Sequence, residues 1–155
     1  MADVGQKAPD FTLSTDTGGA VHLSALKGRP VVVYFYPKDD TSGCTREAQS
    51  FTALDKAFEK IGVRVIGISP DSAASHARFR AKYALSIDLA ADPERKAIEA
   101  YGVWIEKSMY GRKYMGVDRS TFLIDAKGKI SRVWRKVKVP GHAEEVLAAA
   151  QALIS

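Results

Sequence analysis

Two apolar runs dominate the hydrophobic pattern in the first half of the chain, at residues 31–36 and 63–69. Both runs are short, rich in β-branched or aromatic residues and bounded by Pro or Gly, which predicts two buried strands. Between them, apolar residues recur at steps of three and four, which predicts an amphipathic helix over about 43–60 that ends at Gly62. These helical positions are Ala48, Phe51, Leu54, Phe58 and Ile61.

The rest of the pattern alternates in the same way. It predicts, in chain order, a hairpin of 11–13 and 21–23, a helical turn at 24–28, a helix opened by Pro70-Asp71-Ser72, a short strand near 87–89, a helix over 93–101, two strands at 119–125 and 130–136, and a closing helix at 142–153. Periodicity is weak between Gly102 and Asp118, where we expect a long loop. We therefore expect one α/β domain over 1–155, with a central mixed sheet flanked by helices and an N-terminal β-hairpin.

Composition narrows the class of protein. Hydrophobic residues make up 46% and charged residues 26% of the chain, as is usual for globular proteins, and no apolar stretch approaches the 18 residues of a membrane span. The first residues lack the apolar core of a signal peptide. A single cysteine cannot form an internal disulfide, which favours a reducing compartment. We expect a cytoplasmic protein.

The net charge of +5 arises largely between Lys107 and Lys138, where ten Lys and Arg residues face only two Asp residues. Such a segment could bind nucleic acid or an acidic partner. The aromatic residues within it form no RNA-binding motif, so we favour a solvated face and do not expect nucleic-acid binding.

Cys44 is the most informative single residue. It follows the predicted strand 31–36 and a turn-like segment, so it should lie in the first turn of the next helix, at the sheet edge where α/β proteins bind ligands. A free cysteine is often only a small buried hydrophobe. Here the neighbours are Gly43, Thr45 and Arg46, and both a nearby cation and a helix N-terminus favour the thiolate form. We interpret Cys44 as a reactive thiol.

Three segments of the chain, one of which contains this thiol, resemble the peroxiredoxins. They are Ala8-Pro9-Asp10-Phe11-Thr12-Leu13, the run from Leu26 to Pro37, and the signature Pro37-x-x-x-Thr41-x-x-Cys44. The segments Lys38 to Ala48 and Arg119 to Asp125 are similar to the peroxiredoxin Q branch, also called bacterioferritin comigratory protein. The resemblance covers nearly the whole chain and implies a thioredoxin fold.

The resemblance also implies a peroxidase. Its peroxidatic nucleophile would be Cys44, which attacks a peroxide oxygen and becomes a sulfenic acid. Thr41 would hydrogen-bond the sulfur and the peroxide, Arg119 would stabilise the thiolate and orient the peroxide, and Pro37 would shield the pocket from water. Taken one at a time, these three could be a capping residue, a surface cation and the end of a strand.

Glu47 shares the helical face of Cys44, three residues on, and could hydrogen-bond Arg119 or a backbone donor, or be solvated. The three histidines, His22, His76 and His142, have no metal-ligand spacing, so we expect neither metal nor cofactor. A cysteine hydrolase would need a histidine base beside Cys44, which the sequence does not indicate.

The chain departs from its relatives at two positions. Many members of the branch carry a resolving cysteine at a position that is Gln49 here, and others carry it near Arg80. The sulfenic acid would then need an external thiol, with thioredoxin, glutaredoxin or glutathione as candidate donors, and it would be prone to overoxidation.

We expect a monomer, with a dimer as the alternative. A redox sensor without turnover, or a basic binding module, is the rival function.

Overall fold

A computed structural model describes residues 2–155, and Met1, the first residue of the predicted domain, lies outside the described residues. The elements are β1 (Thr12–Ser14), β2 (Ala20–His22), a 3-10 helix η1 (Leu23–Leu26), β3 (Val31–Phe35), α1 (Ser42–Ala53), α2 (Asp55–Lys60), β4 (Arg64–Ser69), α3 (Ala73–Tyr83), β5 (Asp88–Ala91), α4 (Lys96–Ala100), β6 (Trp104–Met109), β7 (Arg112–Val117), β8 (Ser120–Ile124), β9 (Ile130–Trp134) and α5 (His142–Ile154).

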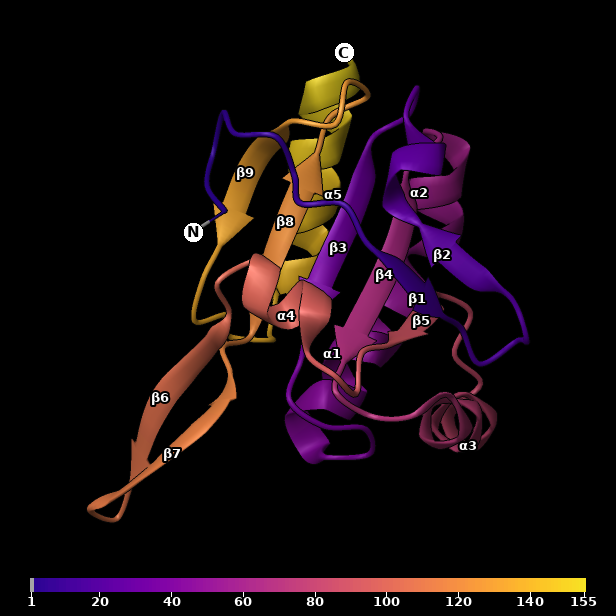
Figure 1. The fold of residues 1–155 in the computed structure, drawn as a ribbon. Coiled ribbons are helices and arrows are strands. Elements are labelled where there is room, and N and C mark those ends of the chain that lie inside the picture. The colour runs from indigo at the N-terminus through magenta and orange to yellow at the C-terminus, as the bar shows by residue number, and fades with distance from the viewer. Residues whose placement is uncertain (1) are drawn as a thin grey trace.

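The central sheet has the strand order β5-β4-β3-β8-β9. Strand β3 pairs in parallel with β4 and antiparallel with β8, so the sheet is mixed. Helices pack on both faces of this sheet (Figure 1), and β1 and β2 form the separate N-terminal hairpin. The expected α/β thioredoxin fold with a central mixed sheet is confirmed.

Strand β3 is buried on both faces, as a central strand between two helical layers must be. Because successive side chains point to opposite faces, Val31, Val33 and Phe35 join the core beneath α4 and the N-terminal hairpin. Val32 and Tyr34 join the core beneath α1, α2, α3 and α5, which also contains Cys44. The thiol is therefore anchored in the larger helical layer.

The prediction of a long loop between Gly102 and Asp118 is wrong. Strands β6 and β7 pair as an antiparallel hairpin with a two-residue turn, Tyr110-Gly111, and this hairpin projects from the body of the protein (Figure 1). Both turn residues have positive φ, the signature of the tight turns that suit strand twist. Most side chains of the hairpin are exposed on both faces, so the alternation that reveals a half-buried strand does not develop.

The sequence predicts a single helix over 43–60, and the structure has two helices there. Helix α1 ends at Ala53 and α2 starts at Asp55, with Leu54 between them outside helical geometry. The apolar spacing continues across the break because both helices pack on the same face of the sheet. The other expected elements are present, with ends that differ by a few residues.

In residues 2–155, no helix has the length and apolar character needed to cross a membrane.

Candidate active site

The sheet topology brings two distant segments to one edge. Cys44 lies in the first turn of α1, just beyond the carboxyl end of β3, as expected. Strand β8 runs antiparallel to β3 and pairs Ser120 with Phe35, so the residue before β8 lies beside that same end. That residue is Arg119, which is 75 positions from the thiol in sequence.

Arg119 contacts the thiol directly. Its Nη2 donates to Cys44 Sγ at 3.4 Å, and the sulfur is buried, with only 2% of the residue exposed. A side chain at Gly43 would not fit easily, because its Cβ would lie 3.1 Å from Nη2. Glycine here lets the guanidinium approach the start of the helix. A fixed cation and the dipole of α1 both stabilise negative charge on this sulfur.

Glu47 is the second partner of Arg119. Nη1 of the arginine donates to Glu47 Oε1 at 2.7 Å, and the carboxylate is 1% exposed. Burial raises the pKa of Glu47 from 4.5 to about 7, against the lowering effect of the Arg119 charge and hydrogen bond. Its second oxygen, Oε2, is buried and has no hydrogen-bond partner within residues 2–155. The sequence left open a bond to Arg119, a bond to a backbone donor and a solvated carboxylate for Glu47, and the structure shows the bond to Arg119.

Burial alone would lower the pKa of the Arg119 guanidinium, but the charges of Glu47 and Cys44 raise it. Arg119 is only 18% exposed, so it is not one more surface cation of the basic segment. A permanently charged guanidinium held by a buried carboxylate and aimed at a sulfur can stabilise negative charge that moves along a bond to that sulfur.

The other two predicted residues lie in the loop between β3 and α1. Pro37 is half-buried at its start. Thr41 is exposed, and its hydroxyl donates to the carbonyl of Lys38 at 2.9 Å rather than capping α1. A hydroxyl that has given its proton to a carbonyl offers only its oxygen to a neighbour, so Thr41 is set as an acceptor. The structure gives no direct contact of either side chain with the sulfur among its described interactions.

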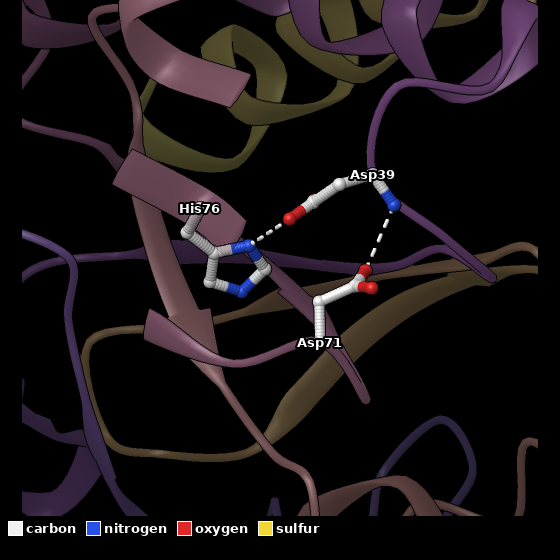
Figure 2. Close-up of side chains that lie close together, drawn as sticks. All are labelled: Asp39, Asp71 and His76. Atoms are coloured by element: carbon white, nitrogen blue, oxygen red, sulfur yellow. Dashed lines mark hydrogen bonds and ion pairs between the residues drawn. The ribbon is translucent and has the colours of Figure 1, made fainter. Parts of the chain in front are cut away.

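The same loop contains a buried group that the sequence analysis missed. Asp39 lies against His76 of α3, and its backbone N–H donates to Asp71 (Figure 2). Asp39 is more than 30 positions from Asp71 and His76 in sequence, so no local spacing could reveal the group. Their ligand atoms lie within 4.8 Å of one another, as metal ligands can. However, His76 Nδ1 and Asp39 Oδ2 are only 2.7 Å apart, the distance of a hydrogen bond with no room for a cation between them.

The three histidines are all engaged away from the thiol. His22 bonds Asp10 and Ser24, His76 bonds Asp39, and His142 Nε2 lies 2.8 Å from the Thr121 hydroxyl. Burial lowers the pKa of His142 to about 4, so it is neutral at pH 7. Among the described contacts, Cys44 therefore has an arginine beside it and no histidine, which does not fit a cysteine hydrolase.

The structure combines a thioredoxin fold with a thiol at a strand-to-helix junction and a paired arginine beside that thiol. These features together are those of a thiol oxidoreductase. The sequence model of the AhpC/TSA family matches residues 4–133. The chain belongs to this family, the peroxiredoxins, and within it to the peroxiredoxin Q or bacterioferritin comigratory protein branch. It is therefore an enzyme of the peroxiredoxin class, with peroxidase activity.

Individual relatives agree over nearly the full length. The chain is 48% identical to peroxiredoxin Bcp of Bacillus subtilis, over 94% of this chain and 92% of the relative. It is also similar to a structure from a study of the alkyl peroxide reduction activity of Xanthomonas campestris bacterioferritin comigratory protein, with a TM-score of 0.92, 41% identity, and coverage of 99% and 100% of the two chains. A mutant structure of Xylella fastidiosa PrxQ gives a TM-score of 0.93 at 38% identity, with coverage of 98% and 97%.

Proposed function

We propose that the chain reduces hydrogen peroxide and organic hydroperoxides through a sulfenic acid on Cys44, and that an external thiol restores the enzyme. The observation that carries this proposal is the contact of Arg119 Nη2 with Cys44 Sγ, because it pairs the one thiol of the chain with a fixed positive charge. Antioxidant defence would be the role of such an enzyme.

In the first step, the Cys44 thiolate attacks the terminal oxygen of the peroxide. An S–O bond forms and the O–O bond breaks, so the sulfur is oxidised to the sulfenic acid and the leaving oxygen takes a proton to become water or an alcohol. Arg119 stabilises the negative charge as it passes from sulfur to the leaving oxygen. Thr41 accepts a hydrogen bond from the peroxide, and Pro37, which has no N–H, limits access of water.

The second step needs two thiol groups from outside the chain. The first attacks the sulfenic sulfur, forming a mixed disulfide and releasing water, and the second reduces that disulfide to free Cys44. No second cysteine of this chain can do so, because Cys44 is the only one. Gln49 is exposed on α1, and Arg80 is committed to an ion pair with Asp16. Thioredoxin, glutaredoxin and glutathione are the candidate donors.

The alkyl peroxide reduction activity named for the Xanthomonas campestris relative supports the inclusion of organic hydroperoxides. We further propose that the chain acts as a single domain over 1–155 in the cytoplasm, as a monomer or, alternatively, a dimer, and that it needs no cofactor and no nucleic acid.

The decisive experiment measures peroxide-dependent oxidation of thioredoxin, glutaredoxin and glutathione systems by the wild type and by Cys44→Ser. Sustained turnover by the wild type, abolished in Cys44→Ser, is expected, and the system that supports it identifies the donor. Consumption of a single equivalent of peroxide with every donor would instead indicate a sensor. The absence of any reaction by reduced Cys44 would refute the peroxidase.

Overoxidation can be tested separately by intact mass. Because no cysteine of this chain can trap the sulfenic acid, a second peroxide should oxidise it to the sulfinic acid. Excess peroxide without a thiol donor should therefore add two oxygen atoms to Cys44, and Cys44→Ser, which has the same methionines, should gain two fewer oxygen atoms than the wild type. A wild-type mass that stops at one added oxygen after repeated doses would contradict this expectation.

A further inference from the structure

The loop that leads to Cys44 is tied to α3 through the buried carboxylate of Asp39. Asp39 Oδ1 accepts from the Tyr36 hydroxyl at 2.6 Å, and Oδ2 accepts from Ser75 at 2.8 Å and lies 2.7 Å from His76 Nδ1. Ser75 and His76 lie in the first turns of α3. One carboxylate thus joins the end of β3, the loop and the helix that packs beside them.

Both ring nitrogens of His76 are engaged. Its Nε2 lies 3.0 Å from the carbonyl oxygen of Ala90, which can only accept, so Nε2 donates. Its Nδ1 faces the Asp39 carboxylate. Burial alone would raise the pKa of Asp39, but hydrogen bonds from His76 and Tyr36 lower it below its usual value. The buried carboxylate of the loop is therefore held by the hydrogen bonds that surround it.

A second anchor holds the backbone of the same loop. Asp71 Oδ2 accepts from the Asp39 N–H at 2.8 Å and from the Ser69 hydroxyl at 2.6 Å (Figure 2 shows the first of these bonds). Ser69 ends β4, the strand parallel to β3, so the loop is fixed to the neighbouring strand as well as to α3.

The next residue is held in an unfavourable backbone conformation. Asp40 has φ of 58°, in the left-handed region, and its carboxylate accepts from Lys82 at 2.8 Å and from the Tyr83 hydroxyl, both at the end of α3. A non-glycine residue keeps such a conformation only when its surroundings enforce it. Thr41 follows directly, and α1 with Cys44 begins one residue later.

We propose that Asp39 and His76 are positioning residues for the reaction at Cys44. By holding the loop against α3, they set the orientation of Thr41 and of the first turn of α1 relative to Arg119, although neither touches the sulfur in any described contact. The expected effect on the rate of reaction with peroxide rests on the proposed function. The expected effect on the structure, a fixed and buried Cys44, does not depend on that function.

The test compares Asp39→Asn, His76→Asn and the double variant with a matched control, Asp16→Asn. The control also neutralises a buried carboxylate that pairs with α3, through Arg80, but that pair does not touch the loop. Ser75→Ala, which removes only one bond to Asp39, is a milder variant should the charge changes prevent folding. For each reduced protein, one measures the rate constant for oxidation by hydrogen peroxide and, separately, for alkylation of Cys44 by iodoacetamide.

We expect the peroxide rate constant to fall about tenfold to a hundredfold in Asp39→Asn and His76→Asn, because small displacements of reacting groups have effects of this size. The double variant should lose little more than either single one, since both act through one contact. Alkylation, which needs no peroxide geometry, should speed up as Cys44 becomes less buried. Ser75→Ala should change both rates in the same directions by a smaller factor, and Asp16→Asn should stay within about twofold of the wild type in both.

Peroxide and alkylation rates that stay at wild-type values in Asp39→Asn and His76→Asn, or a control that changes as much as they do, would overturn the proposal. If the wild type itself fails to reduce peroxide, the peroxidase proposal fails, and alkylation alone decides the positioning role. Faster alkylation in the two loop variants but not in Asp16→Asn would then still support it, and equal rates in all would refute it.

Discussion

The structure contains two arginine–carboxylate pairs of similar burial that differ in how completely they are bonded. In the first, Arg80 of α3 pairs with Asp16 of the N-terminal hairpin, and in the second Arg119 pairs with Glu47 of α1. The two carboxylates are 2% and 1% exposed, and the two arginines are 23% and 18% exposed. By burial alone the pairs would be taken for equivalents.

Their hydrogen bonds separate them. Arg80 bonds both oxygens of Asp16 and also donates to the carbonyls of Leu85 and Ile87. Arg119 bonds one oxygen of Glu47, directs its other terminal nitrogen at Cys44, and leaves Glu47 Oε2 without a partner among the described residues. In the first pair, every guanidinium nitrogen and both carboxylate oxygens have a partner, and the pair joins two parts of the fold. In the second pair, one carboxylate oxygen has no partner within residues 2–155, and the arginine contacts a thiol. An unsatisfied buried group is costly for stability, and such groups gather at functional sites.

The largest difference between the two pairs is expected when each arginine is neutralised in turn. Arg119→Gln should lower the rate constant of Cys44 with peroxide by about a hundredfold or more, because in the proposed mechanism it removes the cation that stabilises negative charge on the leaving oxygen. Arg80→Gln should leave that rate constant within about twofold and act on stability instead. Stopped-flow oxidation by hydrogen peroxide measures both, and equal losses in the two variants would show that the pairs do not differ in role.

Glu47→Gln tests the electrostatic cost of the second pair. Burial raises the pKa of Glu47 from 4.5 to about 7, so the native state binds this proton more tightly than the unfolded chain. The stability that this proton contributes is present below about pH 4.5 and is lost as the pH rises through about 7. One pKa unit corresponds to about 1.4 kcal/mol, so the loss is about 3 kcal/mol.

In Glu47→Gln this titration is absent. The free energy of unfolding of the variant, relative to wild type, should therefore rise by about 3 kcal/mol between pH 4.5 and 8. Urea unfolding across that pH range measures the difference, with Asp16→Asn as a control that retains Glu47. Parallel pH curves for wild type and Glu47→Gln would contradict the raised pKa.

Asp16→Asn tests how much the first pair contributes to stability. It leaves Arg80 without a charged partner, and because that side chain can still reach water, the free energy of unfolding should fall by about 2 kcal/mol. Thermal and urea unfolding at pH 7 give the value, and peroxide kinetics should be unchanged. A loss of peroxide reactivity beyond about twofold would mean that the Arg80–Asp16 pair also contributes to the active site.

The smallest effect is expected from Tyr34→Phe. The Tyr34 hydroxyl is buried without a hydrogen-bond partner in the described part of the chain, and burial together with the Glu47 charge raises the pKa of this phenol well above its usual value. Removing an unsatisfied buried hydroxyl costs no hydrogen bond, so the free energy of unfolding should change by less than about 1 kcal/mol. A loss of several kcal/mol would reveal a partner for this hydroxyl.

The fold was largely predictable because its main strands are continuous apolar runs. Apart from the exposed Arg64, residues 31–36 and 63–69 are buried, and a strand of this kind can be recognised without knowing its neighbours. The hairpin of β6 and β7 was missed for the opposite reason, since its side chains are mostly exposed and only main-chain pairing defines it. The Tyr110-Gly111 turn was the one local signal available.

The site was predictable in part. The position of Cys44 in the first turn of α1 follows from the local pattern, and the choice of Arg119 came from the resemblance to a family rather than from spacing. The roles assigned to Cys44, Thr41, Arg119 and Pro37 remain predictions that the kinetic experiments above address.

The sequence alone determined the layered α/β fold, the strand-to-helix position of the only thiol and the lack of a second cysteine, because these depend on neighbours in the chain and on composition. The three-dimensional fold was needed to show which arginine contacts the sulfur, that Glu47 is buried with one oxygen unpartnered within residues 2–155, and that Asp39 pairs with His76. Each of these contacts joins residues brought together by sheet pairing or helix packing. Burial and charge depend on such pairing, which no local stretch of sequence encodes by itself.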